Sequence, residues 1–245
     1  LAGQPGIAIG SVIGSNISNI LLILGVSALI APLVIPVRKL WRDLGFMLAA
    51  TAALWVMLGD GQVSRLDGLL LLVGLAAFLT TAFIAGRGQP PEQAPKRGGP
   101  TWLPWAMTGA GLCLLVVGAD LLVDSATTIA REFGISEAVI GLTIVAVGTS
   151  LPELATSVVA ALRRQTEISV GNVIGSNIFN IFGILGVTAM ISPIPAEARF
   201  AAADMWWAAA AAVGLTLTAF LLGGLPRKAG FALLAAYGGY LLLIG

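Results

Sequence analysis

The sequence contains no histidine and has a single cysteine, Cys113. Histidine is the commonest metal ligand and the commonest general base near neutral pH, and one cysteine cannot form an internal disulfide. Zinc sites, Ser/His proteolysis and thiol redox pairs are therefore disfavoured. An enzyme is the least favoured class of function, and the composition implies no bound cofactor.

Charged residues are also scarce. They make up 10% of the 245 residues, against about 25% in soluble proteins, while 58% are hydrophobic and the mean hydropathy is +0.97. The formal net charge of +1 leaves no field that would recruit nucleic acid. At roughly 20 apolar residues per crossing, the chain has room for about eight helices and little else. The sequence therefore predicts an all-α, polytopic membrane protein.

Stretches without charge predict the positions of these spans. Lys and Arg concentrate in the loops after spans one, three, five and seven, which by the positive-inside rule are cytoplasmic. We therefore expect a multi-pass protein of the inner cell membrane with both ends of this chain outside. The predicted spans are 7–32, 44–59, 67–86, 102–123, 137–162, 168–192, 204–223 and 227–244.

A segment rich in proline and glycine, residues 87–101, interrupts the apolar pattern. Such a composition is typical of a linker, and we expect a cytoplasmic connector. It divides the chain into a three-span part, residues 1–86, and a five-span part, residues 102–245.

The first and sixth spans are copies of one another. Aligned at an offset of 161, residues 10–33 and 171–194 are identical at 16 of 24 positions, which include the pattern Gly-Ser-Asn-Ile-x-Asn. Spans five apart in a serpentine chain run in opposite directions, so the copies predict an inverted-topology repeat, the organisation of many secondary transporters with a midplane ion site. The alternative is a pair of glycine-rich packing helices, but packing alone does not require paired asparagines at mid-depth.

The fifth predicted span carries a deeply placed carboxylate, Glu153. An ionised carboxylate in hydrocarbon costs at least a few kcal/mol, so it is a candidate functional group. Pro152 should kink the helix and free carbonyl groups near Ala146. Thr149 and Ser150 add hydroxyl oxygens, and hard cations such as Na⁺ and Ca²⁺ prefer oxygen ligands. The alternative is a simple proline kink with a protonated glutamic acid in the packing.

Polar residues of the repeated segment lie at the depth of Glu153. Ser176 and Asn180 are four residues apart and share a helix face, with Asn177 beside them. These groups could be neutral ion ligands or interhelical hydrogen bonds, and their repetition in the first copy favours a site. The equivalent residues of the first copy are Ser15, Asn16 and Asn19.

Two further acidic residues, Asp120 and Asp124, lie near the outer end of the fourth span. We expect them to face water or a vestibule, with a role in ion entry as the alternative.

Three stretches carry a specific resemblance to a known family: Gly148-Thr-Ser-Leu-Pro-Glu153, Gly175-Ser-Asn-Ile-Phe-Asn180 and Gly14-Ser-Asn-Ile-Ser-Asn19. Through them the sequence resembles the bacterial branch of the sodium/calcium exchanger (cation/calcium antiporter) family along essentially its whole length. The resemblance implies ten transmembrane helices in two inverted repeats joined by a central cytoplasmic loop.

The resemblance also implies the ion ligands. Na⁺ and Ca²⁺ would be transported substrates, bound within the bilayer. The ligands carried over are Thr149, Ser150, Glu153, Ser176 and Asn180 with the carbonyl of Ala146 from the second repeat, and Ser15 and Asn19 from the first.

The sequence departs from the family pattern in two ways. Asn180 stands where well-studied members often have aspartate, and the counterpart of the fifth span would fall before residue 1. The chain begins with Leu1 and has no basic segment of a signal peptide, so we expect it to lack the first two helices of the family fold.

The leading hypothesis is a secondary antiporter in which inward Na⁺ flow drives Ca²⁺ out by alternating access at one shared site. The alternatives are coupling to H⁺ or K⁺, for which Asn180 is the motivating residue, and a truncated fragment that binds cations without moving them. The sequence indicates no particular oligomeric state.

Overall fold

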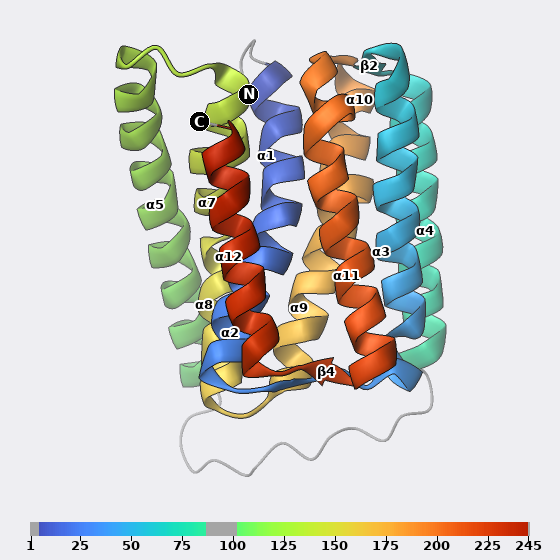
Figure 1. The fold of residues 1–245 in the computed structure, drawn as a ribbon, viewed down its shortest axis with the longest axis vertical. Coiled ribbons are helices and arrows are strands. Elements are labelled where there is room, and N and C mark those ends of the chain that lie inside the picture. The colour runs from blue at the N-terminus through green and yellow to red at the C-terminus, as the bar shows by residue number, and fades with distance from the viewer. Residues whose placement is uncertain (1–4, 87–101, 245) are drawn as a thin grey trace.

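A computed structural model describes residues 5–86 and 102–244, so the predicted connector, 87–101, lies outside the described residues. The described chain is an upright bundle of helices with two short strand pairs (Figure 1). The elements are α1 (Pro5–Ser18), η1 (Asn19–Ile23), α2 (Leu24–Ile30), β1 (Leu33–Val34), α3 (Val37–Met57), η2 (Leu58–Asp60), β2 (Gln62–Val63), α4 (Arg65–Gly86), α5 (Trp102–Glu132), α6 (Glu137–Ile140), η3 (Gly141–Val145), α7 (Ala146–Thr149), α8 (Leu151–Leu162), α9 (Thr166–Phe179), η4 (Asn180–Leu185), α10 (Gly186–Ile191), β3 (Ile194–Pro195), η5 (Phe200–Asp204), α11 (Met205–Leu222), β4 (Gly224–Leu225) and α12 (Arg227–Ile244).

Six helices of the described residues are long and apolar enough to cross a membrane, or up to seven if the bent pair 137–149 and 151–162 is one span. These seven correspond to the first seven predicted spans. The eighth, 227–244, is the 18-residue helix α12 but is not among them, since Arg227 and Lys228 in its first turn lower its mean hydropathy. Each of the eight predicted spans therefore coincides with a helix or a broken helix of the described residues, and seven of them are candidate membrane spans.

The ends of two spans differ from the prediction. α3 begins at Val37, seven residues before the predicted start at 44, and takes Arg38, Lys39 and Arg42 into its first turns. α5 continues to Glu132, well beyond the predicted end at 123. Charged residues end a hydropathy window, but they do not end a helix whose first or last turns reach the polar interface.

The two copies of the repeat cross the bundle in opposite directions, as the sequence predicts. α1 starts at the upper end in Figure 1 and α9 at the lower end. β1 pairs with β4 through Leu33 and Leu225, and β2 pairs with β3 through Val63 and Ile194. The offset of 161 places residue 33 of β1 on residue 194 of β3, and residue 63 of β2 on residue 224 of β4. The two strand pairs are therefore equivalent in the two repeats. They lie at opposite ends of the bundle (Figure 1).

Glycine contacts repeat the same symmetry within the packing. A Cβ atom added to Gly230 would lie 2.9 Å from the carbonyl oxygen of Gly25, and one added to Gly68 would lie 2.9 Å from that of Gly186. Only glycine allows two helix backbones to approach so closely. α2 therefore packs on α12 as α10 packs on α4.

Burial distinguishes the centre of the bundle from its edge. Within residues 7–30, 83% of the residues in the most apolar stretch are buried inside the protein. In the most apolar stretch of α5, only 6% are buried. The first copy of the repeat is therefore the central element, and α5 stands at the left edge of the bundle in Figure 1.

Candidate ion-binding site

The helix that carries Glu153 is broken at one residue. Ser150, with φ −91° and ψ 0°, ends α7 and precedes α8, and the two parts meet at a bend of 46°. Pro152 lies in the first turn of α8, where its missing N–H removes no helical hydrogen bond. The kink predicted at Pro152 therefore lies at Ser150, the one residue between α7 and α8.

Glu153 lies in the first turn of α8, where the helix dipole favours a negative charge. Its Oε1 atom accepts a hydrogen bond of 3.1 Å from the Ser176 hydroxyl. Its Oε2 atom is buried and has no hydrogen-bond partner among the described residues. A buried carboxylate oxygen without a donor is costly, so the arrangement favours a cation beside it.

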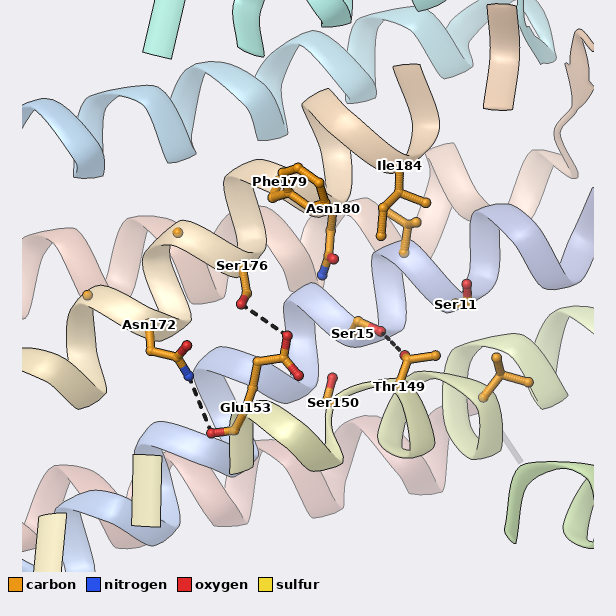
Figure 2. A pocket seen from close by; sticks show the side chains of 14 residues that line it. Ser11, Ser15, Thr149, Ser150, Glu153, Asn172, Ser176, Phe179, Asn180 and Ile184 are labelled. Atoms are coloured by element: carbon orange, nitrogen blue, oxygen red, sulfur yellow. Dashed lines mark hydrogen bonds between the residues drawn. The ribbon is translucent and has the colours of Figure 1, made fainter. Parts of the chain in front are cut away.

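A cavity of about 700 Å³ surrounds this carboxylate (Figure 2). Oxygen-bearing side chains from three helices line it, and Glu153 is the one charged side chain among the lining residues. The set includes six predicted site residues, Ser15, Thr149, Ser150, Glu153, Ser176 and Asn180, and two that the sequence did not single out, Ser11 and Asn172.

Hydroxyl groups join the central helix to the broken helix. Ser15 Oγ lies 2.9 Å from Thr149 Oγ1, and both hydroxyls donate to the carbonyl of Ala146, at 3.2 and 3.1 Å. That carbonyl also accepts from the backbone N–H of Ser150 at 3.1 Å. The Ala146 carbonyl is therefore within the hydroxyl network and does not line the cavity, so its role as a ligand stays a prediction.

The two copies of the repeat meet at their asparagines. Asn16 Nδ2 donates to the carbonyl of Asn177 at 3.2 Å, and Asn177 Nδ2 donates to that of Asn16 at 3.3 Å. Asn19 Nδ2 donates to Asn177 Oδ1 at 2.9 Å. Asn19, at the start of η1, and Asn177, on α9, are thus buried where the two copies cross and do not line the cavity. For these two predicted site residues the observed contacts are interhelical hydrogen bonds.

Ser11 and Asn172 could have been predicted as lining residues from the sequence. They occupy equivalent positions in the two copies, 11 and 172, and each precedes a predicted ligand, Ser15 or Ser176, by four residues. Asn172 Nδ2 donates to the carbonyl of Glu153 at 3.4 Å and to Ser157 Oγ at 3.2 Å. Extending the spacing of four by one turn would have found both residues.

The same glycines have different surroundings in the two copies. A Cβ atom on Gly14 would collide with the Leu142 carbonyl, and one on Gly10 would lie 3.0 Å from that of Ala138. Their equivalents, Gly171 and Gly175, have no described atom within 4 Å of such a Cβ atom and line the cavity. In α1, the face that carries these glycines packs against residues 138–146. In α9, the equivalent face is uncovered within the described residues and borders the cavity.

With this geometry established, comparison with known proteins identifies the family. The model of the family described as "Sodium/calcium exchanger protein" matches residues 1–84 and 103–245. The chain belongs to the sodium/calcium exchanger family. Members of this family are exchangers rather than enzymes, and the ions are their substrates rather than cofactors.

Individual relatives agree with this assignment. The chain is 38% identical to CaxA of Alkalimonas amylolytica, over 99% of this chain and 79% of that protein, and 41% identical to the inner membrane protein YrbG of Escherichia coli (strain K12), over 78% and 62%. A solved structure of the sodium-calcium exchanger NCX_Mj, soaked with Na⁺ and Sr²⁺, matches with a TM-score of 0.76 and 37% identity, covering 95% of this chain and 75% of that one. These similarities support a multi-pass membrane protein and cation/calcium antiport.

Proposed function

We propose that the protein is a secondary antiporter that exchanges Na⁺ for Ca²⁺ by alternating access at the cavity around Glu153. The supporting observation is the Oε2 atom of Glu153, buried and without a hydrogen-bond partner among the described residues. The hydroxyls of Thr149, Ser150 and Ser176 surround that carboxylate with further oxygens. This is the donor set that Na⁺ and Ca²⁺ share.

Competition for one carboxylate provides the coupling. Glu153 carries one negative charge, so a Na⁺ and a Ca²⁺ at this site compete for the same carboxylate and binding of one ion species displaces the other. In the proposed orientation the chain lies in the inner cell membrane with residues 87–101 in the cytoplasm and the C-terminal end outside. The structure has both described ends, Pro5 and Ile244, at one end of the bundle (Figure 1), as this orientation requires.

The test is uptake of radioactive Ca²⁺ into Na⁺-loaded vesicles that contain the complete protein. Replacing Glu153 with Gln keeps the shape of the side chain and removes its charge. We expect the Na⁺-driven uptake to fall by roughly 100-fold or more, since a charge about 4 Å from a cation contributes several kcal/mol in a partly buried site.

Glu167→Gln is the matched control. Glu167 begins the same helix as Ser176, but its side chain is 53% exposed and pairs with Lys39 at 3.2 Å. Its replacement should leave uptake within about twofold of wild type, because exposed ion pairs contribute little. Equal uptake by wild type and Glu153→Gln would exclude the proposed site.

The single charge of the cavity favours a second candidate, coupling to K⁺ or H⁺. Glu153 alone cannot balance the two charges of Ca²⁺, and Asn180 presents a neutral amide to the same cavity. Driving uptake in turn with Na⁺, K⁺ and pH gradients separates the candidates. Uptake that responds to a K⁺ or pH gradient and not to Na⁺ would replace the first proposal with the second.

A further inference from the structure

Four asparagines form one connected hydrogen-bond network where the two copies of the repeat cross. The offset of 161 relates them in two pairs, residue 16 with 177 and residue 19 with 180. Three of them, Asn16, Asn19 and Asn177, are at most 5% exposed. The fourth, Asn180, lines the cavity around Glu153 (Figure 2). The network therefore runs from the buried crossing to the candidate ion site.

Backbone carbonyls fix the orientation of the central pair of asparagines. An amide side chain can be turned end for end with almost no change in shape, so its partners decide which end carries the oxygen. Asn16 Nδ2 donates to the carbonyl of Asn177 at 3.2 Å, and Asn177 Nδ2 donates to that of Asn16 at 3.3 Å. A carbonyl oxygen only accepts, so the Nδ2 end of each side chain must face it. The Oδ1 ends of both side chains are therefore left as acceptors.

This orientation is passed on to the outer pair of asparagines. Asn180 Nδ2 donates to Asn16 Oδ1 at 3.0 Å, and Asn19 Nδ2 donates to Asn177 Oδ1 at 2.9 Å. Asn19 Oδ1 is buried without a partner, and Asn180 Oδ1 takes part in no hydrogen bond among the described residues. In both copies the network therefore holds the donor end of the outer amide and leaves its oxygen free.

Asn180 shares the cavity with the one charged side chain that lines it. Asn180 follows Ser176 by four residues on the same helix face, and the Ser176 hydroxyl donates to Glu153 Oε1 at 3.1 Å. An amide oxygen is a ligand for Na⁺ or Ca²⁺, whereas the N–H groups at the other end of the amide repel a cation. The end of this amide that faces the cavity therefore decides whether residue 180 attracts or repels the ion.

We propose that Asn16 is a positioning residue for the cation, because it accepts from Asn180 Nδ2 and so keeps Asn180 Oδ1 available to an ion in the cavity. Asn16 itself does not line the cavity. This inference rests on the proposed function, since it concerns cation binding in that same cavity. The orientation of Asn180 is then a property of the crossing of the two repeats, set by the carbonyl of Asn177.

Asn16→Leu tests the proposal, because leucine has nearly the same shape as asparagine and cannot accept a hydrogen bond. Without the acceptor, the Asn180 amide can turn its N–H groups toward the cavity. We expect equilibrium binding of radioactive Ca²⁺ to the purified complete protein to weaken by about 10–100-fold, the usual effect of removing a group that orients a metal ligand. Asn16→Asp is the conservative variant. Its carboxyl still offers an oxygen to Asn180, so binding should be at least as tight as in wild type.

The same substitution in the Asn180→Asp background separates positioning from packing. An ionised aspartate presents oxygen at both ends, so its orientation no longer matters. Asn16→Leu should then change the Ca²⁺ affinity by less than about threefold, a coupling between the two positions that independent effects would not give. A merely structural role of Asn16 would weaken binding equally in both backgrounds and would overturn the proposal.

Thermal unfolding without Ca²⁺ shows whether each variant is folded. Asn16→Ala takes the place of Asn16→Leu in the same comparison if leucine does not fit the crossing. Wild-type Ca²⁺ affinity in the folded variant would overturn the role of Asn16 alone. Wild-type Ca²⁺ affinity in Glu153→Gln would overturn the proposed function instead, so the two failures are distinguishable.

Discussion

At the scale of single residues, the charge of the cavity depends on one side chain beside Glu153. Asn180 lines the cavity and donates from Nδ2 to Asn16 Oδ1 at 3.0 Å. The amide thus belongs to the crossing of the repeats on one side and to the ion cavity on the other. A neutral group here leaves one negative charge for whatever cation enters.

Asn180→Asp should therefore shift the preference of the site toward divalent ions. A second carboxylate near Glu153 repels it when the cavity is empty and is neutralised by Ca²⁺ better than by Na⁺. We expect the ratio of Ca²⁺ to Na⁺ affinity to rise by about tenfold or more, as judged from the Coulomb energy at such distances. Competition between radioactive Ca²⁺ and Na⁺ at equilibrium measures this ratio.

Asn180→Ala separates charge from hydrogen bonding, because it removes the bond to Asn16 and adds no charge. An identical ratio of Ca²⁺ to Na⁺ affinity in Asn180→Asp and Asn180→Ala would mean that the added carboxylate does not reach the bound cation.

At the scale of elements, the two copies of the repeat differ in what covers them. α1 packs against residues 138–146 through Gly10 and Gly14, whereas Gly171 and Gly175 of α9 face the cavity. Within the described residues, one sequence pattern thus packs closely in the first copy and lines a cavity in the second. The difference lies in the neighbours and not in the repeated residues.

Gly14→Ala and Gly175→Ala should consequently have opposite effects on stability. The added methyl at residue 14 collides with the Leu142 carbonyl and Ala146, at a cost of about 1–3 kcal/mol for overpacking. At residue 175 it meets no described atom within 4 Å, and the better helix propensity of alanine should contribute about 0.5–1 kcal/mol.

Thermal unfolding of the 245-residue chain in detergent tests this pair. Gly14→Ala should lower the Tm and Gly175→Ala should keep or raise it. A Tm lowered equally by both would show that α9 is covered at Gly175 as α1 is at Gly14.

Sequence patterns predicted the elements of the site better than its contacts. A spacing of four residues fixes a shared helix face, and Ser176 and Asn180 both line the cavity. Which face meets which neighbour depends on tertiary packing. The sequence could not reveal that Asn19 bonds to Asn177, as its equivalent Asn180 bonds to Asn16, because spacing along one helix does not determine which face of another helix it meets.

At the scale of the whole molecule, a buried polar network attaches the last helix to the bundle. Arg199 Nε pairs with Asp204 Oδ2 at 3.1 Å, and Tyr240 OH donates to Asp204 Oδ1 at 3.2 Å. The Asp204 side chain is 1% exposed, so these bonds are not exchanged for water. Tyr237, on the same helix, buries a hydroxyl with no partner among the described residues.

The two tyrosines of α12 therefore provide a direct comparison. Tyr240→Phe removes a hydrogen bond to a buried carboxylate and should lower the free energy of unfolding by about 1.5–3 kcal/mol. Tyr237→Phe removes an unsatisfied hydroxyl and should be neutral or stabilising. Denaturation in mixed detergent measures both, and a larger loss for Tyr237→Phe would contradict the assigned network.

The general architecture was predictable because apolar length and an internal repeat depend on sequence alone. The inverted arrangement followed from the odd separation of spans one and six. The start of α3 and the end of α5 were not predictable, because residues that border the membrane can be charged and still helical. The strand pairs were not predictable either, because strands of two residues such as Leu33–Val34 are too short to show an alternating hydrophobic pattern.

The strand pair at Leu33 and Leu225 also bears on how the chain is assembled during synthesis. Its partners are 192 residues apart (225 minus 33), and the buried amides of Asn16 and Asn19 find their partner at Asn177. Asn16 and Asn19 can therefore form these bonds only after the second copy of the repeat has been synthesised. Residues 5–86 are in this sense one part of a folding unit that residues 102–244 complete.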